Sequence, residues 1–267
     1  MKQQRIVFIG GGNMAEALIS GLVKTGHDTA KITVTDPIES RLAELAECYG
    51  IQTSTHNVDA IENADAIVIA VKPKMVESVL TEIGSRIPEG ATVVSIAAGI
   101  GIQKMKDSAR RDQLALIRVM PNTPALLGAG MSVLFGKAEQ QHKDRASYIL
   151  SASGETAWVD EERLLHAATA VSGSGPAYFF LLAETLRAAG ESLGLSKDLA
   201  AKLANQTALG SGKMLVESGR DAATLRAQVT SPGGTTQAAL DAMYESDFPT
   251  AVRKGVQAAS KRSKELS

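Results

Sequence analysis

The sequence has few of the features that mark disulfide scaffolds or metal sites. It contains a single cysteine, Cys48, so no disulfide can form within the chain, and a reducing compartment is expected. Cys48 lies in a helical pattern, and we expect it to be a buried core residue and not a nucleophile. The four histidines show no ligand spacing with each other or with the cysteine, so no metal is expected.

The sequence also lacks a charge excess and long apolar runs. Its net charge is −1, with 21% charged and 44% hydrophobic residues, which provides no electrostatic footprint for nucleic acid or an anionic membrane. No stretch approaches the ~18 apolar residues of a membrane span, and the first apolar run is too short for a signal peptide. We therefore expect a soluble cytoplasmic protein that acts on a small molecule, with no nucleic-acid or membrane partner.

The first 160 or so residues alternate β-branched runs with amphipathic helical patterns. This alternation predicts an α/β domain with a mostly parallel, doubly wound sheet covered on both faces. The predicted strands are Arg5–Ile9, Ile32–Thr35, Ala66–Val71, Thr92–Ile96, Leu116–Met120 and Ser132–Phe135. The predicted helices between the early strands include Met14–Lys24, Glu39–Tyr49 and Met75–Arg86.

From about Glu161 onward the pattern is helical only. We therefore predict two domains, a Rossmann-like domain over 1–160 and an all-helical domain over 161–267. The predicted helices are Pro176–Leu193, Asp198–Glu217, Thr236–Ser246 and Pro249–Lys264, with Gly194 and Gly219 as stops. The second of these helices carries small residues that permit close approach of another helix, either within the domain or across a subunit interface. These small residues are Ala208, Gly210, Ser211 and Gly212.

A glycine-rich turn after the first strand predicts a dinucleotide site. Gly10, Gly12 and Ala15 fit the G-x-G-x-x-G/A fingerprint between a strand and a helix. Gly10 allows the tight turn, Gly12 lets a pyrophosphate approach the backbone, and Ala15 lets the helix pack closely on the strand. The start of the helix presents free N–H groups and a partial positive charge to the phosphates.

The end of the second strand bears on the choice between NAD and NADP. Asp36 follows this strand, at the place where an acidic residue would bind a ribose 2′-hydroxyl and repel a 2′-phosphate. Arg41 lies about one helical turn downstream and could offset that charge. The two residues argue in opposite directions, so the preference stays open at this point.

Three further loops follow strand ends, where open α/β sheets place their ligands. Lys72, after Val71, could lie along the cofactor or be a solvated turn residue. Ala97 and Ala98 follow the next strand, and Asn122 lies between two prolines after the one beyond it. We expect all five residues to contribute to cofactor binding.

The segment from Thr230 to Thr236 does not resemble ordinary packing sequence. A Pro-Gly-Gly turn leads into a helix, exposing backbone N–H groups and the hydroxyls of Ser231, Thr235 and Thr236. Such a turn could bind a carboxylate or could be a plain N-cap, and the loop at 172–176 has the same two interpretations. The loops contain no histidine–carboxylate pair, which favours hydride addition to an already electrophilic iminium.

At these residues the chain resembles the pyrroline-5-carboxylate reductases, enzymes of proline biosynthesis. The resemblance extends over nearly the whole length. The motifs that carry it are 9–15 (IGGGNMA), 71–73 (VKP), 95–99 (SIAAG), 120–124 (MPNTP), 172–178 (SGSGPAY) and 230–236 (TSPGGTT). It implies NAD(P)H-dependent reduction of the cyclic imine 1-pyrroline-5-carboxylate to L-proline, by dimers that often assemble into decamers.

The resemblance also implies residue roles. The pyrophosphate would be held by Gly10, Gly12, Asn13 and Met14, the adenosine ribose by Asn57, and the nicotinamide side would be lined by Val71, Lys72 and Ala98. Gly234, Thr235 and Thr236 would bind the substrate carboxylate, with the Thr236 hydroxyl near the imine nitrogen. The family generally prefers NADPH, and several members carry serine where this chain has Asp36, so that preference is not carried over.

Two other functions fit parts of the pattern. A β-hydroxyacid dehydrogenase also joins a Rossmann domain to helices, and Lys202 and Lys213 are the candidates for its catalytic lysine, but the 230–236 segment would then be unexplained. A dinucleotide sensor without catalysis would bind cofactor but would not need the imine-site motifs. Turnover of the imine with a reduced nicotinamide tests the reductase hypothesis, and a tight cofactor complex without turnover would favour the sensor.

Overall fold

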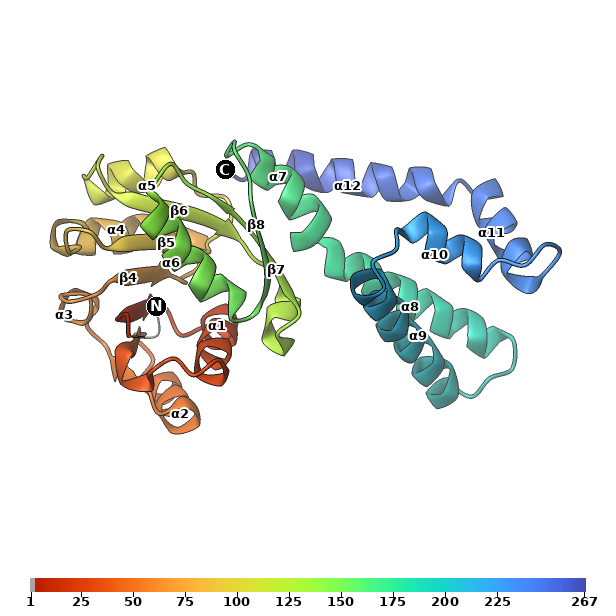
Figure 1. Cartoon of the computed structure of the whole chain (residues 1–267), viewed down its shortest axis with the longest axis horizontal. Coiled ribbons are helices and arrows are strands. Elements are labelled where there is room, and N and C mark those ends of the chain that lie inside the picture. Colours follow the sequence, from red (N-terminus) through yellow and green to blue (C-terminus); the bar gives the residue numbers. More distant parts are fainter. Residues whose placement is uncertain (1–2) are drawn as a thin grey trace. The chain divides into compact units, whose positions relative to one another are not determined.

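The computed structural model describes residues 3–267 and divides them into two compact units (Figure 1). The first unit contains the residues up to Gly173 together with Ser260–Ser267, and the second is Ser174–Ala259.

The first unit is built on one sheet that, over residues 3–267, has the strand order β3-β2-β1-β4-β5-β6-β7-β8. The strands are β1 (Ile6–Ile9), β2 (Ile32–Thr35), β3 (Gln52–Ser54), β4 (Ala66–Ile69), β5 (Thr92–Ser95), β6 (Ala115–Met120), β7 (Gly130–Phe135) and β8 (Gly154–Trp158). Strands β1 to β6 are parallel, β7 is antiparallel to β6, and β8 is parallel to β7. The predicted fold class is confirmed.

Helices cover both faces of this sheet. The helices are α1 (Asn13–Lys24), α2 (Glu39–Tyr49), α3 (Asn57–Ala60), α4 (Val76–Ile83), α5 (Ile102–Ala109), α6 (Gln140–Ser151) and α7 (Leu164–Ala168). One hydrophobic core joins one face of the sheet to α1, α2 and α6, and a second joins the other face to α4 and α5. Strands β1, β4 and β5 are buried at every position, because a parallel sheet with two covered faces needs continuous apolar runs.

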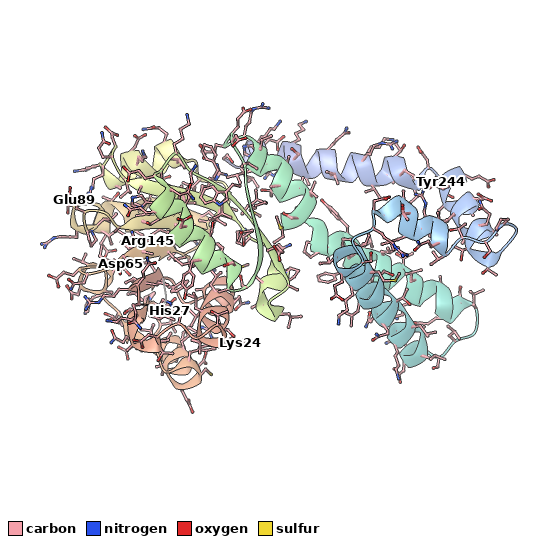
Figure 2. The ribbon with its side chains drawn as sticks, in the orientation of Figure 1. Lys24, His27, Asp65, Glu89, Arg145 and Tyr244 are labelled. Atoms are coloured by element: carbon pink, nitrogen blue, oxygen red, sulfur yellow. The ribbon has the colours of Figure 1, made fainter. Side chains whose placement is uncertain are left out.

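Helix α6 is tied to the edge of the sheet at which the parallel strands begin. Arg145 donates from Nη1 to the backbone oxygens of Asp65 and Gly90, at 3.1 and 2.7 Å, just before β4 and β5 (Figure 2). Tyr148 from the same helix is 2.9 Å from Nδ1 of the buried His27. These contacts lie on the side of the sheet opposite to the one at which the parallel strands end.

In the described part of the chain, the second unit is helical throughout. Its helices are α8 (Gly175–Ser192), α9 (Lys197–Glu217), α10 (Ala222–Gln228), α11 (Thr235–Glu245) and most of α12 (Phe248–Glu265), which ends in the first unit. Gly194 and Gly219 adopt φ of +95° and +66° just beyond α8 and α9. Glycine tolerates this left-handed conformation, which confirms both residues as the predicted stops.

The sequence predicted six of the strands and missed β3 and β8. Strand β3 has three residues, none of them buried, so it lacks an apolar signal. Strand β8 has no fully buried residue, and it begins at Gly154, where an added Cβ would lie 2.1 Å from the Gly130 oxygen. The expectation for Cys48 was wrong, because α2 buries the face that carries Leu42 and Leu45 and leaves Cys48 exposed.

Candidate active site

The structure brings the predicted cofactor residues together at the edge where the parallel strands end. Each follows a strand of the sheet: Gly10, Gly12, Asn13 and Met14 follow β1, Asp36 follows β2, Val71 and Lys72 follow β4, Ala97 and Ala98 follow β5, and Asn122 follows β6. Asn57 lies beyond the short β3. Strand β1 lies between β2 and β4, so the strand order reverses there, which is where doubly wound sheets bind ligands.

The turn from β1 into α1 has the geometry that a pyrophosphate requires. Gly10 has φ +101°, and a Cβ there would lie 2.9 Å from backbone atoms of Ala70, so only glycine fits. At Gly12 an added Cβ would meet nothing within 4 Å, so the space beside this residue is open. No side chain caps α1, so its first N–H groups are available to an anion. The residues present therefore fit a dinucleotide.

The carboxylate of Asp36 is held against the glycine turn. Its Oδ2 accepts a hydrogen bond from the Gly11 N–H at 2.9 Å, and its Oδ1 accepts one from the Ile38 N–H at 3.0 Å. Because an ionised carboxylate has about four lone-pair positions, two remain for further donors. The side chain thus lies beside the glycine turn.

Arg41 also contacts the glycine turn, and three of its five N–H donors are engaged. Its Nε donates to the Gly11 oxygen at 2.7 Å, while Nη2 lies 2.5 Å from Glu16 Oε2 and Nη1 lies 3.1 Å from Glu44 Oε2. The hydrogen bond from Arg41 lowers the pKa of Glu16, and the same bond raises the pKa of Arg41. Sequence reasoning missed Glu16, because it is 25 residues from Arg41 and no local pattern links the two.

The remaining polar residues at this edge are engaged with the fold. Asn57 accepts a 2.6 Å hydrogen bond from the Thr35 hydroxyl and donates to Glu82 at 3.0 Å. Lys72 is exposed and precedes Pro73, which begins a short 3₁₀ turn. Ala98 is exposed, whereas Ala97 is 4% exposed, so of these two side chains only that of Ala98 faces solvent.

Asn122 has a structural role that the sequence did not reveal. Its Nδ2 donates to the Ser172 oxygen at 3.0 Å, and its Oδ1 accepts from the Met131 N–H at 2.8 Å. The side chain thereby links the loop after β6 to β7 and to the 172–176 loop. Its side-chain amide nitrogen and oxygen are each engaged, so any contact with a cofactor would add to these bonds.

The predicted substrate residues lie in the second unit. Gly233 has φ +70°, the Gly234 N–H donates to the Ser231 oxygen at 3.0 Å, and α11 begins at Thr235 with Gly234 as its N-cap. No side chain caps this helix. Within residues 3–267, the hydroxyls of Ser231, Thr235 and Thr236 have no hydrogen-bond partner. None of these hydroxyls caps α11, so the first N–H groups of this helix are open to an anion.

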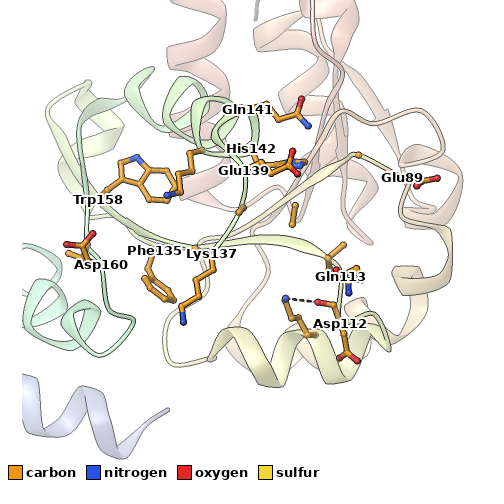
Figure 3. A pocket seen from close by; sticks show the side chains of 18 residues that line it. Glu89, Asp112, Gln113, Phe135, Lys137, Glu139, Gln141, His142, Trp158 and Asp160 are labelled. Carbon is orange, nitrogen blue, oxygen red and sulfur yellow. Dashed lines mark hydrogen bonds between the residues drawn. The ribbon is translucent and has the colours of Figure 1, made fainter.

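A cavity of about 840 Å³ lies elsewhere in the first unit, at the opposite edge of the sheet (Figure 3). It is lined by residues at the start of β6 and the ends of β7 and β8, including Phe135 and Trp158. Lys143 lies over the Trp158 ring, 5.6 Å from its centroid. None of the predicted site residues lines it, and a dinucleotide binds at the other edge, so we do not assign the cofactor to this cavity.

The described chain offers neither a metal cluster nor a membrane-spanning helix. Among residues 3–267, histidine, cysteine and carboxylate side chains form no group of three that could hold a metal ion. In the same range, no helix is both long enough and apolar enough to cross a membrane.

Comparisons with known proteins agree with the geometry. A family model for pyrroline-5-carboxylate reductase dimerisation matches residues 162–266, and one described as NADP oxidoreductase coenzyme F420-dependent matches residues 5–99. The chain is 41% identical over 269 residues to a pyrroline-5-carboxylate reductase of Pseudomonas aeruginosa, covering 100% of this chain and 98% of the relative. The chain belongs to the pyrroline-5-carboxylate reductase family. The helical part of the reductase thus carries the family's dimerisation domain.

Solved structures of relatives have the same fold as this reductase. That of a pyrroline-5-carboxylate reductase from Coxiella burnetii has a TM-score of 0.96 and 37% identity, covering 99% of this chain and 98% of the other. A Plasmodium falciparum pyrroline carboxylate reductase with NADP bound has a TM-score of 0.86 and 29% identity, covering 100% of this chain and 99% of the other. The resemblance inferred from the motifs is confirmed.

Proposed function

We propose that the protein reduces the cyclic imine 1-pyrroline-5-carboxylate to L-proline, the last step of proline biosynthesis, with hydride from NADPH or NADH. Family membership over the full length supports the reaction. The open glycine turn supports a dinucleotide, and the Plasmodium falciparum relative has NADP bound. The main support for the substrate-binding roles is the start of α11, which no side chain caps. There the hydroxyls of Ser231, Thr235 and Thr236 have no hydrogen-bond partner among the described residues.

We assign the cofactor residues by their place at the carboxyl edge of the sheet. The turn residues Gly10, Gly12, Asn13 and Met14 would bind the pyrophosphate, and Asp36 and Asn57 the adenosine ribose. The nicotinamide side would be formed by Val71, Lys72, Ala97, Ala98 and Asn122. The reduced nicotinamide, when bound, supplies the hydride that adds to the carbon of the C=N bond.

We assign substrate binding to the second unit. The N–H groups at the start of α11 and the hydroxyls of Ser231 and Thr235 would bind the carboxylate, because a helix N-terminus carries about half a positive charge. Thr236 would place its hydroxyl at the imine nitrogen, orienting the protonated imine. The protein then needs no strong general base, because an iminium is already electrophilic.

The second unit supports a homodimer. Most of the large hydrophobic side chains that are exposed in the chain lie in it, among them Phe179, Phe180 and Leu209. Added Cβ atoms at Gly210 and Gly212 would meet nothing within 4 Å, so these small residues do not serve packing within the chain. We propose that this surface forms the dimer interface and that dimers assemble further into a decamer.

We also propose a domain boundary near residue 160, as the match at 162–266 supports, and a cytoplasmic location.

The test is a kinetic comparison at Thr236. With 1-pyrroline-5-carboxylate and either reduced cofactor, the absorbance of the reduced nicotinamide should fall as proline forms. Thr236→Val removes the hydroxyl but keeps the shape, and should lower kcat by about ten- to a hundredfold, the scale of one lost orienting hydrogen bond in a transition state. Thr236→Ser keeps the hydroxyl and should recover most of the rate. Absence of turnover with both cofactors would reject the reductase function, and equal rates for both variants would reject only the role of Thr236.

A further inference from the structure

The region beside the ribose end of the predicted dinucleotide site is anionic. Asp36, Glu16 and Glu44 carry three negative charges, and Arg41 is the one cation that bonds to any of them in the described chain. A 2′-phosphate, which distinguishes NADPH from NADH, would add up to two further negative charges. Whether this region accepts the phosphate therefore depends on how far the charge of Arg41 is already offset by its carboxylate partners.

Arg41 is fixed from two sides. Its Nε donates to the Gly11 oxygen in the glycine turn, and its Nη2 pairs with Glu16 on the first turn of α1. Its side chain is 25% exposed and that of Glu16 is 30% exposed, so this pair is partly shielded from water. Its other partner, Glu44, is 65% exposed, and that contact is correspondingly weaker.

Glu16 is itself held in place. Its Oε2 faces Arg41, and its Oε1 accepts a hydrogen bond from the Tyr49 hydroxyl at 3.0 Å. Tyr49 and Arg41 both belong to α2, whereas Glu16 belongs to α1. The carboxylate therefore bridges α1 and α2 and holds the guanidinium beside the glycine turn.

We propose that Glu16 is a specificity-determining residue that acts through Arg41, and that together with Asp36 it makes this reductase prefer NADH to NADPH. This inference rests on the proposed function only for the position of the cofactor. Asp36 still has two lone-pair positions free for the two hydroxyls of an unmodified ribose, and its charge opposes a 2′-phosphate. Glu16 offsets the charge of Arg41, which is the one cation bonded to these carboxylates in the described chain.

Binding of nucleotide fragments tests the proposal without catalysis. The measurement is the Kd of ADP and of adenosine 2′,5′-bisphosphate, by titration calorimetry on the full-length protein. The wild type should bind ADP at least as tightly as the bisphosphate. Glu16→Gln keeps the side-chain size and releases Arg41, so it should tighten bisphosphate binding about three- to tenfold and leave ADP binding unchanged. The matched control is Glu44→Gln, which alters the exposed partner of the same arginine and should change neither.

Arg41→Gln tests whether Arg41 already binds the 2′-phosphate in the wild type. In the wild-type background it should weaken both fragments equally or not at all, and in the Glu16→Gln background it should abolish the gain for the bisphosphate. A selective loss of bisphosphate binding from Arg41→Gln alone would overturn the proposal, because Arg41 would then already bind the phosphate. An equal effect of Glu16→Gln on both fragments would also overturn it, since that is what a merely structural role predicts. Arg41→Gln alone still decides if Glu16→Gln does not fold.

Kinetics separate this proposal from the assigned reaction. The ratio of kcat/KM for NADH to that for NADPH should exceed one in the wild type and fall in both Glu16→Gln and Asp36→Ser. A wild-type ratio below one would reject the proposed preference. Absence of turnover with either cofactor would reject the reductase function and leave the fragment result standing.

Discussion

Glu162 connects two elements next to the predicted nicotinamide side, so its loss should lower the stability of the first unit. Its Oε1 accepts hydrogen bonds from the Ile102 N–H at 2.9 Å and from Arg118 Nη1 at 2.8 Å. Ile102 is the first residue of α5, which follows the loop containing Ala97 and Ala98, and Arg118 belongs to β6. One carboxylate therefore joins the start of a helix to a strand beneath the predicted nicotinamide side.

The cost of losing this carboxylate follows from burial. The side chain of Arg118 is 8% exposed, and breaking a fully buried ion pair by removing one partner costs about 3–5 kcal/mol. Glu162 is 31% exposed, so water can partly replace it, and we expect Glu162→Ala to lower the free energy of unfolding by about 2–3 kcal/mol. Glu162→Gln keeps an acceptor for the Ile102 N–H and should cost about half as much.

The assay is urea unfolding followed by circular dichroism at one fixed protomer concentration, because dimerisation makes apparent stability depend on concentration. Arg118→Met in the Glu162→Ala background should recover part of the loss, since it removes the unpaired buried charge. The control is Glu161→Ala, whose partner Arg163 is exposed, and it should leave the midpoint unchanged. A loss below about 0.5 kcal/mol for Glu162→Ala, or no recovery in the double variant, would refute the reasoning.

Three further predictions concern packing, pH and assembly. Gly21→Ala would place a Cβ 2.1 Å from the Ala152 oxygen, so the thermal midpoint should drop by an amount that corresponds to at least about 2 kcal/mol, and an unchanged midpoint would contradict the packing of α1 on α6. Burial, followed by the charge of Arg145, lowers the pKa of His142 from its ordinary value of 6.5, so stability should fall as the pH drops below that value. This dependence should be weaker in His142→Gln, and an unaltered urea-midpoint profile from pH 7 to about pH 5 would contradict it. Leu209→Asp places a charge on the exposed apolar surface of α9 and should shift the protein toward monomer in light scattering, whereas an unchanged mass would exclude that residue from the interface.

Local patterns were enough to predict most of the elements. Continuous apolar runs specified β1, β4 and β5, and helices such as α2 and α9 were placed to within a residue at each end. These predictions succeeded because burial on two faces and helical periodicity leave a signal within the segment itself. Strands β3 and β8 left no such signal, because neither has a buried apolar face.

The sequence by itself determined the fold class, the glycine turn and the family, because each is encoded in residues close together along the chain. Only the tertiary structure decided which partners the charged side chains take. The sequence placed Asp36 and Arg41 near the ribose end with opposite effects, and the packing of α1 on α2 then brought Glu16 to Arg41. Such a pairing joins residues that are distant in the chain, and it forms only when the two helices pack side by side on the sheet.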